Sequence, residues 1–296
     1  MGKQVLGVCR ICDYYGRLTR EHFPPKGAFN RDSFKVQGIN EHKRVDDTLV
    51  WYETFKHGGN ASYATCRQCN NLTGDWYARD YINFVNKLQP YAHPMNVGIG
   101  EIDLCDFYPL RVVKQVLCSF LVAIDPDENA ELEAGCAPSV KRDDKLPPSE
   151  LFTDISVAYK ALPQIRSLLL DREAIGLPES VRLYMYLVAQ RAGRSSSIGV
   201  IASRTTGKVA ILSEWAWWPV GWALFFSGEP WEPLLDVTDW ANCGYRTTFV
   251  SATLRLPSYW IEGRYPLDFR HPKSVQQGAA AQQAVLDERQ AARRSP

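Results

Sequence analysis

The sequence predicts an α+β fold, in which a small zinc-stapled module precedes a larger domain with a mainly antiparallel sheet. Two Cys-x-x-Cys pairs near the start of the chain, Cys9/Cys12 and Cys66/Cys69, predict the module. Each pair offers two thiolates on a tight turn, which suits two corners of a tetrahedral zinc site. Farther along, segments with helical periodicity precede short β-branched and aromatic runs between turn residues, which predicts the larger domain.

The composition is that of an ordinary globular protein. Of the 296 residues, 45% are hydrophobic and 23% are charged. Eight cysteines are too few at this length to indicate a disulfide scaffold. The four outside the pairs are expected to be reduced core residues: Cys105, Cys118, Cys136 and Cys243. No apolar run is long enough to span a bilayer, and no signal segment opens the chain, so we expect a soluble cytoplasmic protein without a membrane partner.

Charge divides the chain unevenly. Residues 1–95 hold 13 basic and 9 acidic residues, a net charge of +4, whereas residues 96–273 hold 18 and 22, a net charge of −4. We expect a zinc module at 1–95, an α+β domain at 96–273 and a helical or disordered tail at 274–296. The positive excess lies beside the cysteine pairs, where a phosphate-binding surface would need it.

Within the first part, we expect a short strand that carries Glu21-His22 and is ended by Pro24-Pro25. Residues 26–47 show no clean periodicity and are expected to form an extended loop. Residues 48–55 and 61–65 are expected to form a hairpin that delivers the second cysteine pair. A helix should follow, with Thr73 as its N-cap. Its aromatic stripe favours core packing over base stacking: Tyr77, Tyr81, Phe84, Val85 and Leu88.

The second part is expected to open with a connector at residues 95–106 and a helix at 108–124. A loop or insert at 126–150 and a helix at 151–171 should follow. Strands are predicted after them, at 181–189, 197–203, 208–214, 222–226 and 247–254. The tryptophans at 215, 217, 218 and 222 favour a core or an interface over a cofactor site.

The order of motifs over residues 9–88 resembles the HNH (ββα-metal) endonuclease superfamily on its treble-clef zinc scaffold. A cysteine pair, a strand with Glu21-His22, a second cysteine pair followed by Asn70, and a helix come in that order. Residues 18–26 (LTREHFPPK) and 69–71 (CNN) look like uncharacterised bacterial HNH proteins in particular. The resemblance covers about the first third of the chain.

The resemblance implies a role for each residue of the motif. Glu21 matches the carboxylate that holds a catalytic Mg²⁺ or Mn²⁺, Asn70 the second protein ligand of that ion, and His22 the general base. Asn60 is our candidate for the middle asparagine of the motif. Glu is a longer ligand than Asp, and the 43 residues between His22 and Cys66 imply an insertion. The remaining match is to the structural zinc ligands: Cys9, Cys12, Cys66 and Cys69.

The chemistry of these residue types agrees with that assignment. Carboxylate and amide oxygens are hard ligands that suit Mg²⁺ or Mn²⁺ and leave positions open for a phosphate. A neighbouring histidine can take the proton of the attacking water. Adjacent strand residues point to opposite faces, so Glu21 and His22 can share a site only where the strand ends or kinks. The basic residues placed to contact phosphates are Arg20, Lys26, Lys56 and Arg67.

The expected function is therefore a metal-dependent endonuclease, of the restriction or anti-phage kind that the resemblance implies. DNA is the favoured substrate and RNA the alternative. The C-terminal domain would then serve targeting, sensing or assembly, with a second copy or a partner protein. The alternative is a non-catalytic zinc-knuckle adaptor that binds nucleic acid or protein. The combination of Glu21, His22 and Asn70 favours the nuclease, because an adaptor has no need of it.

Overall fold

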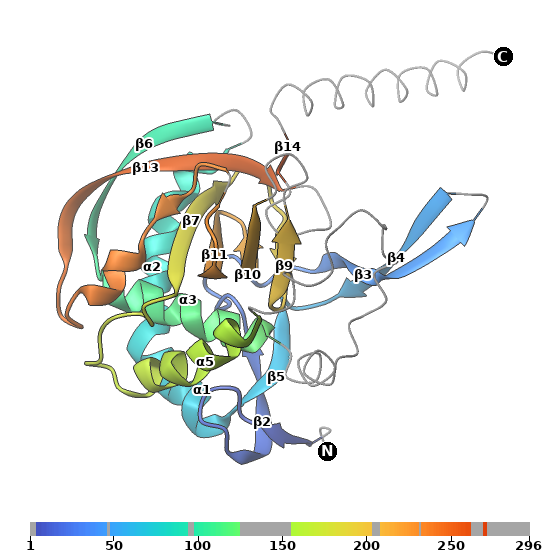
Figure 1. Ribbon diagram of the computed structural model, residues 1–296, viewed down its shortest axis with the longest axis horizontal. Helices are drawn as coiled ribbons and strands as arrows, with labels where there is room; N and C mark the ends of the chain where they lie inside the picture. The colour runs from blue at the N-terminus through green and yellow to red at the C-terminus, as the bar shows by residue number, and fades with distance from the viewer. Residues whose placement is uncertain are drawn as a thin grey trace.

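The computed structural model confirms a mixed α+β protein with mainly antiparallel sheets (Figure 1). The expected insert at 126–150, the tail from residue 274 and Cys136 lie outside the described residues. Across the part of the chain that is described, no helix is both long and apolar enough to cross a membrane. The structure describes residues 4–45, 48–93, 98–124, 155–202, 208–230, 232–261 and 269–270.

A three-stranded antiparallel sheet builds the N-terminal part, in the order β1-β2-β5. Strands β1 (Val5–Val8) and β2 (Tyr15–His22) flank the first cysteine pair, and β5 (Ala61–Cys66) leads into the second. The strand predicted to carry Glu21-His22 is thus present as β2. Its partner β5 brings residues 61–66 beside it although about 40 residues of chain separate them.

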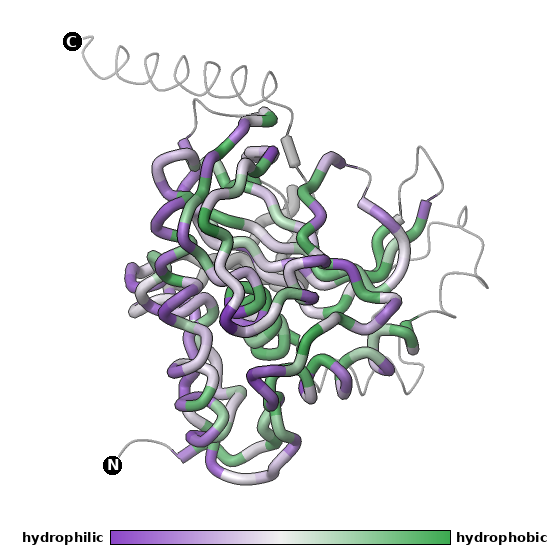
Figure 2. Tube along the Cα trace, turned by 90° about the vertical axis from the view of Figure 1, so that its left-hand side faces the viewer, coloured by the Kyte–Doolittle hydropathy of each residue, from purple (hydrophilic) through white to green (hydrophobic). Residues whose placement is uncertain are grey.

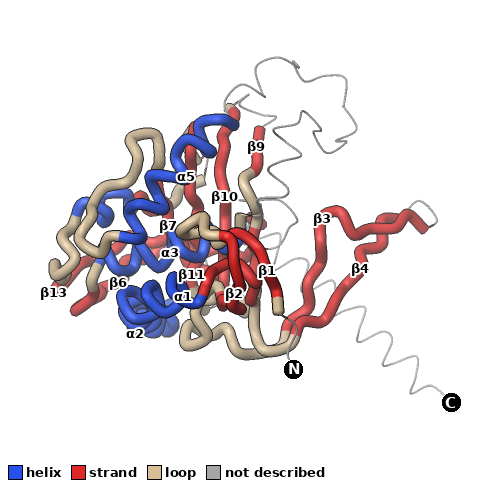
Figure 3. The backbone as a smooth tube through the Cα atoms, turned by 90° about the horizontal axis from the view of Figure 1, so that it is seen from below, coloured by secondary structure: helices blue, strands red, loops and turns tan. Residues whose placement is uncertain are grey.

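The strand predicted at 48–55 is present, but the loop before it and its pairing were predicted wrongly. Within the range expected to be a loop, residues 34–45 form a strand instead: β3 (Phe34–Val45) pairs with β4 (Thr48–Lys56) as an antiparallel hairpin that projects from the body (Figure 3). Since β4 pairs with β3, it forms no hairpin with β5, which pairs with β2 instead.

Strand β3 could not be recognised from the sequence because a β-bulge interrupts its alternation of apolar and polar residues. The register between β3 and β4 shifts between Gln37 and His42. Such a bulge changes which residues share a face, so the alternation of a regular strand is lost.

The helix after the second cysteine pair begins earlier than predicted. Its N-cap is Cys66 and not Thr73, because the Cys66 Sγ accepts a hydrogen bond from the backbone N–H of Cys69. The expected aromatic stripe is buried in the core, as predicted. The helical segments run on as α1 (Arg67–Thr73), a π-helical turn η1 (Gly74–Ala78), α2 (Arg79–Leu88) and a 3-10 turn η2 (Gln89–Tyr91).

The larger sheet has nine strands, and its path runs β14-β13-β7-β11-β10-β8, with β12 paired to β7, β6 to β13 and β9 to β10. All pairings are antiparallel except that of β13 with β7. The connector expected at 95–106 is wrong, because it contains β6, which pairs along β13. The strands are β6 (Gly98–Phe107), β7 (Arg182–Val188), β8 (Gly193–Ser195), β9 (Gly199–Ala202), β10 (Val209–Trp217), β11 (Val220–Ser227), β12 (Leu235–Asp236), β13 (Phe249–Ile261) and β14 (Phe269–Arg270).

Helix α3 (Pro109–Ala123) lies at the centre of the molecule. Of its 15 residues, 13 are buried, and it contacts both β5 of the small sheet and β10 of the large one. One hydrophobic cluster therefore runs from Cys9 and Cys69 through α3 to Trp215. Figure 2 shows the apolar segments gathered inside the molecule. The predicted boundary at residue 95 stays a prediction, but the parts on its two sides share this core.

Two further helices complete the fold. Helix α5 (Ile155–Leu170) packs on α3, at the position predicted for a helix, and the 3-10 helix η4 (Thr238–Asn242) also contacts α3. The tryptophans at 215 and 222 are fully buried core residues, as expected. Among the unpaired cysteines, Cys118 is buried as expected, whereas Cys105 is exposed on β6.

Candidate active site

The four cysteines of the two pairs come together at one point. Their Sγ atoms all lie within 4.8 Å of one another, and Cys12 Sγ and Cys66 Sγ are 3.8 Å apart. A zinc ion with four Zn–S bonds of about 2.3 Å in tetrahedral geometry separates its sulfurs by about 3.8 Å. The four thiols therefore fit a zinc ion with no position left open for another ligand, as in structural zinc sites.

Electrostatics at the cluster agree with a bound cation. A hydrogen bond from the Cys69 thiol lowers the pKa of Cys9 to about 4, against the raising effect of burial, and the same pairing raises the pKa of Cys69. Four sulfurs this close cannot all lose their protons without a positive charge between them, which Zn²⁺ would supply.

The last residues of β2 are braced from two sides. The Asn70 side chain, on the first turn of α1, donates a hydrogen bond from Nδ2 to Thr19 Oγ1 at 3.0 Å. Thr19 Oγ1 in turn donates to the carbonyl of Thr65 on β5 at 2.9 Å. The register of β2 and β5 shifts directly after Thr19, so this brace lies where the strand bends before Glu21-His22.

His22 is oriented by the backbone. Its Nε2 lies 3.1 Å from the carbonyl oxygen of Gly58, which can only accept, so Nε2 carries the proton and Nδ1 is left as the basic nitrogen. Burial lowers the pKa of His22; the Gly58 carbonyl opposes this, and the charges of Lys26 and Arg20 add to it. The imidazole is therefore neutral near physiological pH, which is the state that a general base needs.

Two asparagines hold the chain immediately after His22. Asn60 Nδ2 donates to the carbonyl of Phe23 at 3.1 Å. Asn30, which is fully buried, donates from Nδ2 to the carbonyls of Pro24 and Asn60, and its Oδ1 accepts from the backbone N–H of Asn60 at 2.6 Å. Asn60 remains our candidate for the middle asparagine. Asn30 was missed, because nothing in its sequence context distinguishes it from a loop residue.

The large sheet also anchors this loop. Trp217 Nε1 donates to the carbonyl of Phe29 at 3.2 Å, and the Phe29 ring packs edge-on against Trp218 with centroids 4.7 Å apart. Phe29 has a φ of 60°, in the left-handed region that non-glycine residues seldom adopt. The tryptophan-rich turn between β10 and β11 thus fixes the loop on which the position of His22 depends.

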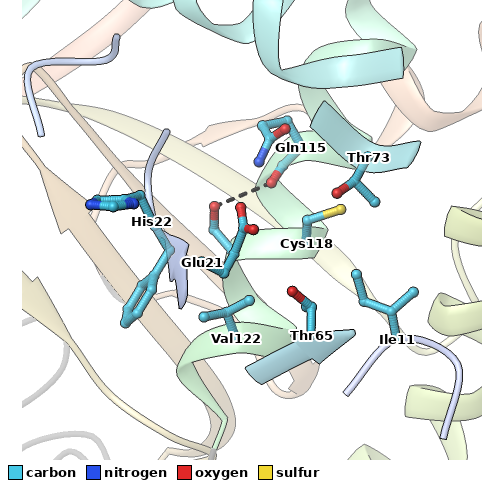
Figure 4. A pocket seen from close by; sticks show the side chains of 10 residues that line it. Ile11, Glu21, His22, Thr65, Thr73, Gln115, Cys118 and Val122 are labelled. Carbon is cyan, nitrogen blue, oxygen red and sulfur yellow. Dashed lines mark hydrogen bonds between the residues drawn. The ribbon is translucent and has the colours of Figure 1, made fainter. Parts of the chain in front are cut away.

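Glu21 points to the other side of β2. Figure 4 shows its side chain directed toward Gln115 and Cys118 of α3, while the His22 imidazole is directed away from them. Burial raises the pKa of Glu21 to about 7. Both residues line one pocket, which is too narrow in this conformation to admit a water molecule.

The walls of this pocket contain two polar atoms without partners. Among the described residues, neither Thr65 Oγ1 nor Gln115 Oε1 has a hydrogen-bond partner, although both side chains are almost fully buried. Both are hard oxygen donors next to a carboxylate, so the pocket fits the chemistry of Mg²⁺ or Mn²⁺. Its size requires the side chains to move apart before an ion could enter. No local pattern in the sequence indicated that α3 would supply this wall.

The structure brings together only some of the predicted site residues. Glu21 and His22 share a pocket, whereas Asn70 does not line it and reaches β2 only through Thr19. The four basic residues predicted to contact phosphate are all exposed: Arg20, Lys26, Lys56 and Arg67. The charges of Arg20 and Lys26 lower the pKa of His22.

Comparison of the chain with models of known families, with curated proteins and with solved structures finds no match.

Proposed function

We propose that the protein is a metal-dependent endonuclease of the HNH type that hydrolyses phosphodiester bonds in DNA, with RNA as the alternative substrate. The observation that carries the proposal is the state of His22. It ends β2 next to a carboxylate, its Nε2–H is held by the Gly58 carbonyl, and two cations lie close enough to lower its pKa. A neutral imidazole with a fixed tautomer beside basic residues is suited to take the proton of a water that attacks a phosphate.

The residues have distinct tasks in this proposal. His22 Nδ1 accepts the proton of the attacking water, while Arg20 and Lys26 attract and position the scissile phosphate. Glu21 would hold a hard divalent ion, Mg²⁺ or Mn²⁺, and Asn70 would become its second ligand after its side chain leaves Thr19. The ion would neutralise charge on the phosphoryl and leaving oxygens. Zinc at the cysteine cluster would be structural, because four sulfur ligands leave it no open position.

The larger domain has a supporting task in the same proposal. Its helix α3 forms one wall of the Glu21 pocket, and its tryptophans hold the loop after His22. We further propose that its outer surfaces serve targeting, sensing or assembly, with a second copy or a partner protein, as in a restriction or anti-phage effector.

One observation favours a second candidate, a non-catalytic zinc-knuckle adaptor. The Glu21 carboxylate is turned into a pocket that holds no water-sized space, and Asn70 lies outside this pocket. An adaptor would keep the cysteine cluster and the exposed basic residues and would have no use for the imidazole of His22.

Incubation of the full chain with supercoiled plasmid, single-stranded DNA and RNA separates the two candidates. We expect nicked and linear plasmid in the presence of Mg²⁺ or Mn²⁺ and none in EDTA, with the zinc content unchanged after a brief EDTA treatment. Binding of these substrates without cleavage under every metal condition would favour the adaptor.

A further inference from the structure

Helix α3 has three buried polar side chains, and among the described residues one of them lacks a hydrogen-bond partner for its acceptor. Lys114 Nζ donates to the carbonyls of Asp171 and Arg172. Ser119 Oγ donates to the carbonyl of Gln115. Gln115 itself is 3% exposed, and its Oε1 accepts no hydrogen bond from a described residue. Such an atom is rare in folded proteins and is often explained by a bound water or ion.

The position of Gln115 on the helix directs it to the Glu21 pocket. Residues at i, i+3, i+4 and i+7 share one face of a helix, and the four residues of α3 that line this pocket have that spacing: Gln115, Cys118, Ser119 and Val122. Thr65 of β5 lines the pocket as well, and Figure 4 shows Glu21 of β2 between Gln115 and Thr65. Three elements thus bring one oxygen-bearing side chain each to the same place.

All three side chains have oxygens without partners in the described part of the chain. Thr65 is 1% exposed, and its Oγ1 has no hydrogen bond there. The Glu21 carboxylate has neither a hydrogen bond nor an ion pair with a described residue, and burial is what acts on its pKa. A carboxylate that is removed from water normally has a cation or several donors beside it. These oxygens therefore match a positively charged ligand.

A divalent cation satisfies the three oxygens together. A water molecule could donate to them, but it would leave the charge of Glu21 uncompensated in a buried place. Carboxylate, amide and hydroxyl oxygens are hard ligands, which suit Mg²⁺ or Mn²⁺. We propose that Gln115 Oε1 and Thr65 Oγ1 are further ligands of the divalent ion held by Glu21.

This inference rests on the proposed function and extends its ion site to the larger domain. Gln115 and Thr65 line the Glu21 pocket already, whereas Asn70 is hydrogen-bonded to Thr19 outside it. The last torsion of a glutamine side chain is soft, so the amide can turn its oxygen to the ion at little cost. An ion held in this way joins α3 to β2 and β5, and the site is incomplete without the helix.

The test is calorimetric titration of the full zinc-loaded chain with Mn²⁺, with the zinc content measured before and after. Gln115→Leu removes the oxygen at similar size and is expected to weaken Mn²⁺ binding at least tenfold, because loss of even an outer partner of a metal ligand costs about 10–100-fold. Thr65→Val should weaken binding by a smaller factor. Gln115→Glu keeps an oxygen at the same reach and adds a charge, so it should bind Mn²⁺ at least as tightly as the wild type.

Ser119→Ala is the matched control for the pocket. Ser119 lines the same pocket, but its hydroxyl is engaged by the carbonyl of Gln115 at 3.2 Å, so its loss should leave Mn²⁺ affinity unchanged. Melting temperatures without Mn²⁺ separate folding from binding. Gln115→Leu should melt at or above the wild-type temperature, because an apolar group replaces an unpaired buried oxygen.

The outcomes distinguish this inference from the proposed function. Mn²⁺ binding that is lost in Glu21→Gln but unchanged in Gln115→Leu would overturn the inference and leave the nuclease proposal in place. Absence of Mn²⁺ binding by the wild type, or weaker binding by Gln115→Glu than by Gln115→Leu, would also overturn it. Binding that depends on both residues in a protein that cleaves no nucleic acid would retain the ion site and remove the proposed nuclease.

Discussion

Cys66→Ser is expected to remove zinc and to unfold the N-terminal part of the protein. We expect a large effect because structural zinc contributes on the order of 10–16 kcal/mol of folding free energy in small domains. Little besides zinc can stabilise the small sheet, because its three strands are short and the cysteines at their ends are part of the hydrophobic core. Zinc content by mass spectrometry of the metal and thermal unfolding by circular dichroism measure both effects.

Substitution by serine separates the loss of the zinc ligand from the loss of the helix cap. Cys66 is also the N-cap of α1, and serine is among the best N-cap residues, so its hydroxyl can replace that hydrogen bond. Cys105→Ser, at an exposed and unpaired cysteine, is the control and should keep both zinc and melting temperature. Retention of one equivalent of zinc and of the wild-type melting temperature in Cys66→Ser would contradict a structural zinc site.

The second large effect is expected from His22→Ala. If His22 Nδ1 takes the proton from water, its loss should slow cleavage by about 10²–10⁴-fold. Zinc content and melting temperature should stay near those of the wild type, because the His22 side chain is hydrogen-bonded to the Gly58 carbonyl in an exposed loop and not in the core. The readout is the single-turnover rate of plasmid nicking.

A neighbouring histidine provides the matched control. His57 is exposed and lies one residue before Gly58, and its Nδ1 is 2.9 Å from Ser33 Oγ. His57→Ala should cleave at nearly the wild-type rate. Equal rates for the wild type and His22→Ala would remove His22 as the base.

The parts of the fold that local patterns determine could be predicted from the sequence. The two Cys-x-x-Cys pairs are brought within 4.8 Å, and the spacing of Leu110, Val113 and Leu117 correctly indicated a helix. Long-range pairing could not be predicted. β5 joins β2 and not the adjacent β4, because the cysteine cluster ties the end of β5 to the turn before β2.

The candidate site divides in the same way. Motif spacing identified Glu21, His22 and Asn70, but it could not show that Glu21 and His22 point to different sides of β2. Gln115 lines the Glu21 pocket and Asn30 hydrogen-bonds the chain after His22 through tertiary contacts. Such contacts leave no local pattern in the sequence. In a chain with one shared core, supporting residues of a site can come from any element that the core brings near.

We expect a second divalent ion to bind at Glu21, separately from the zinc at the cysteines. Titration of the zinc-loaded protein with Mn²⁺, followed by electron paramagnetic resonance, tests it most directly. We expect one Mn²⁺ site in the wild type and its loss in Glu21→Gln, which keeps the size of the side chain, with zinc content and melting temperature unchanged. Equal Mn²⁺ binding by the two proteins, or none by either, would contradict this expectation.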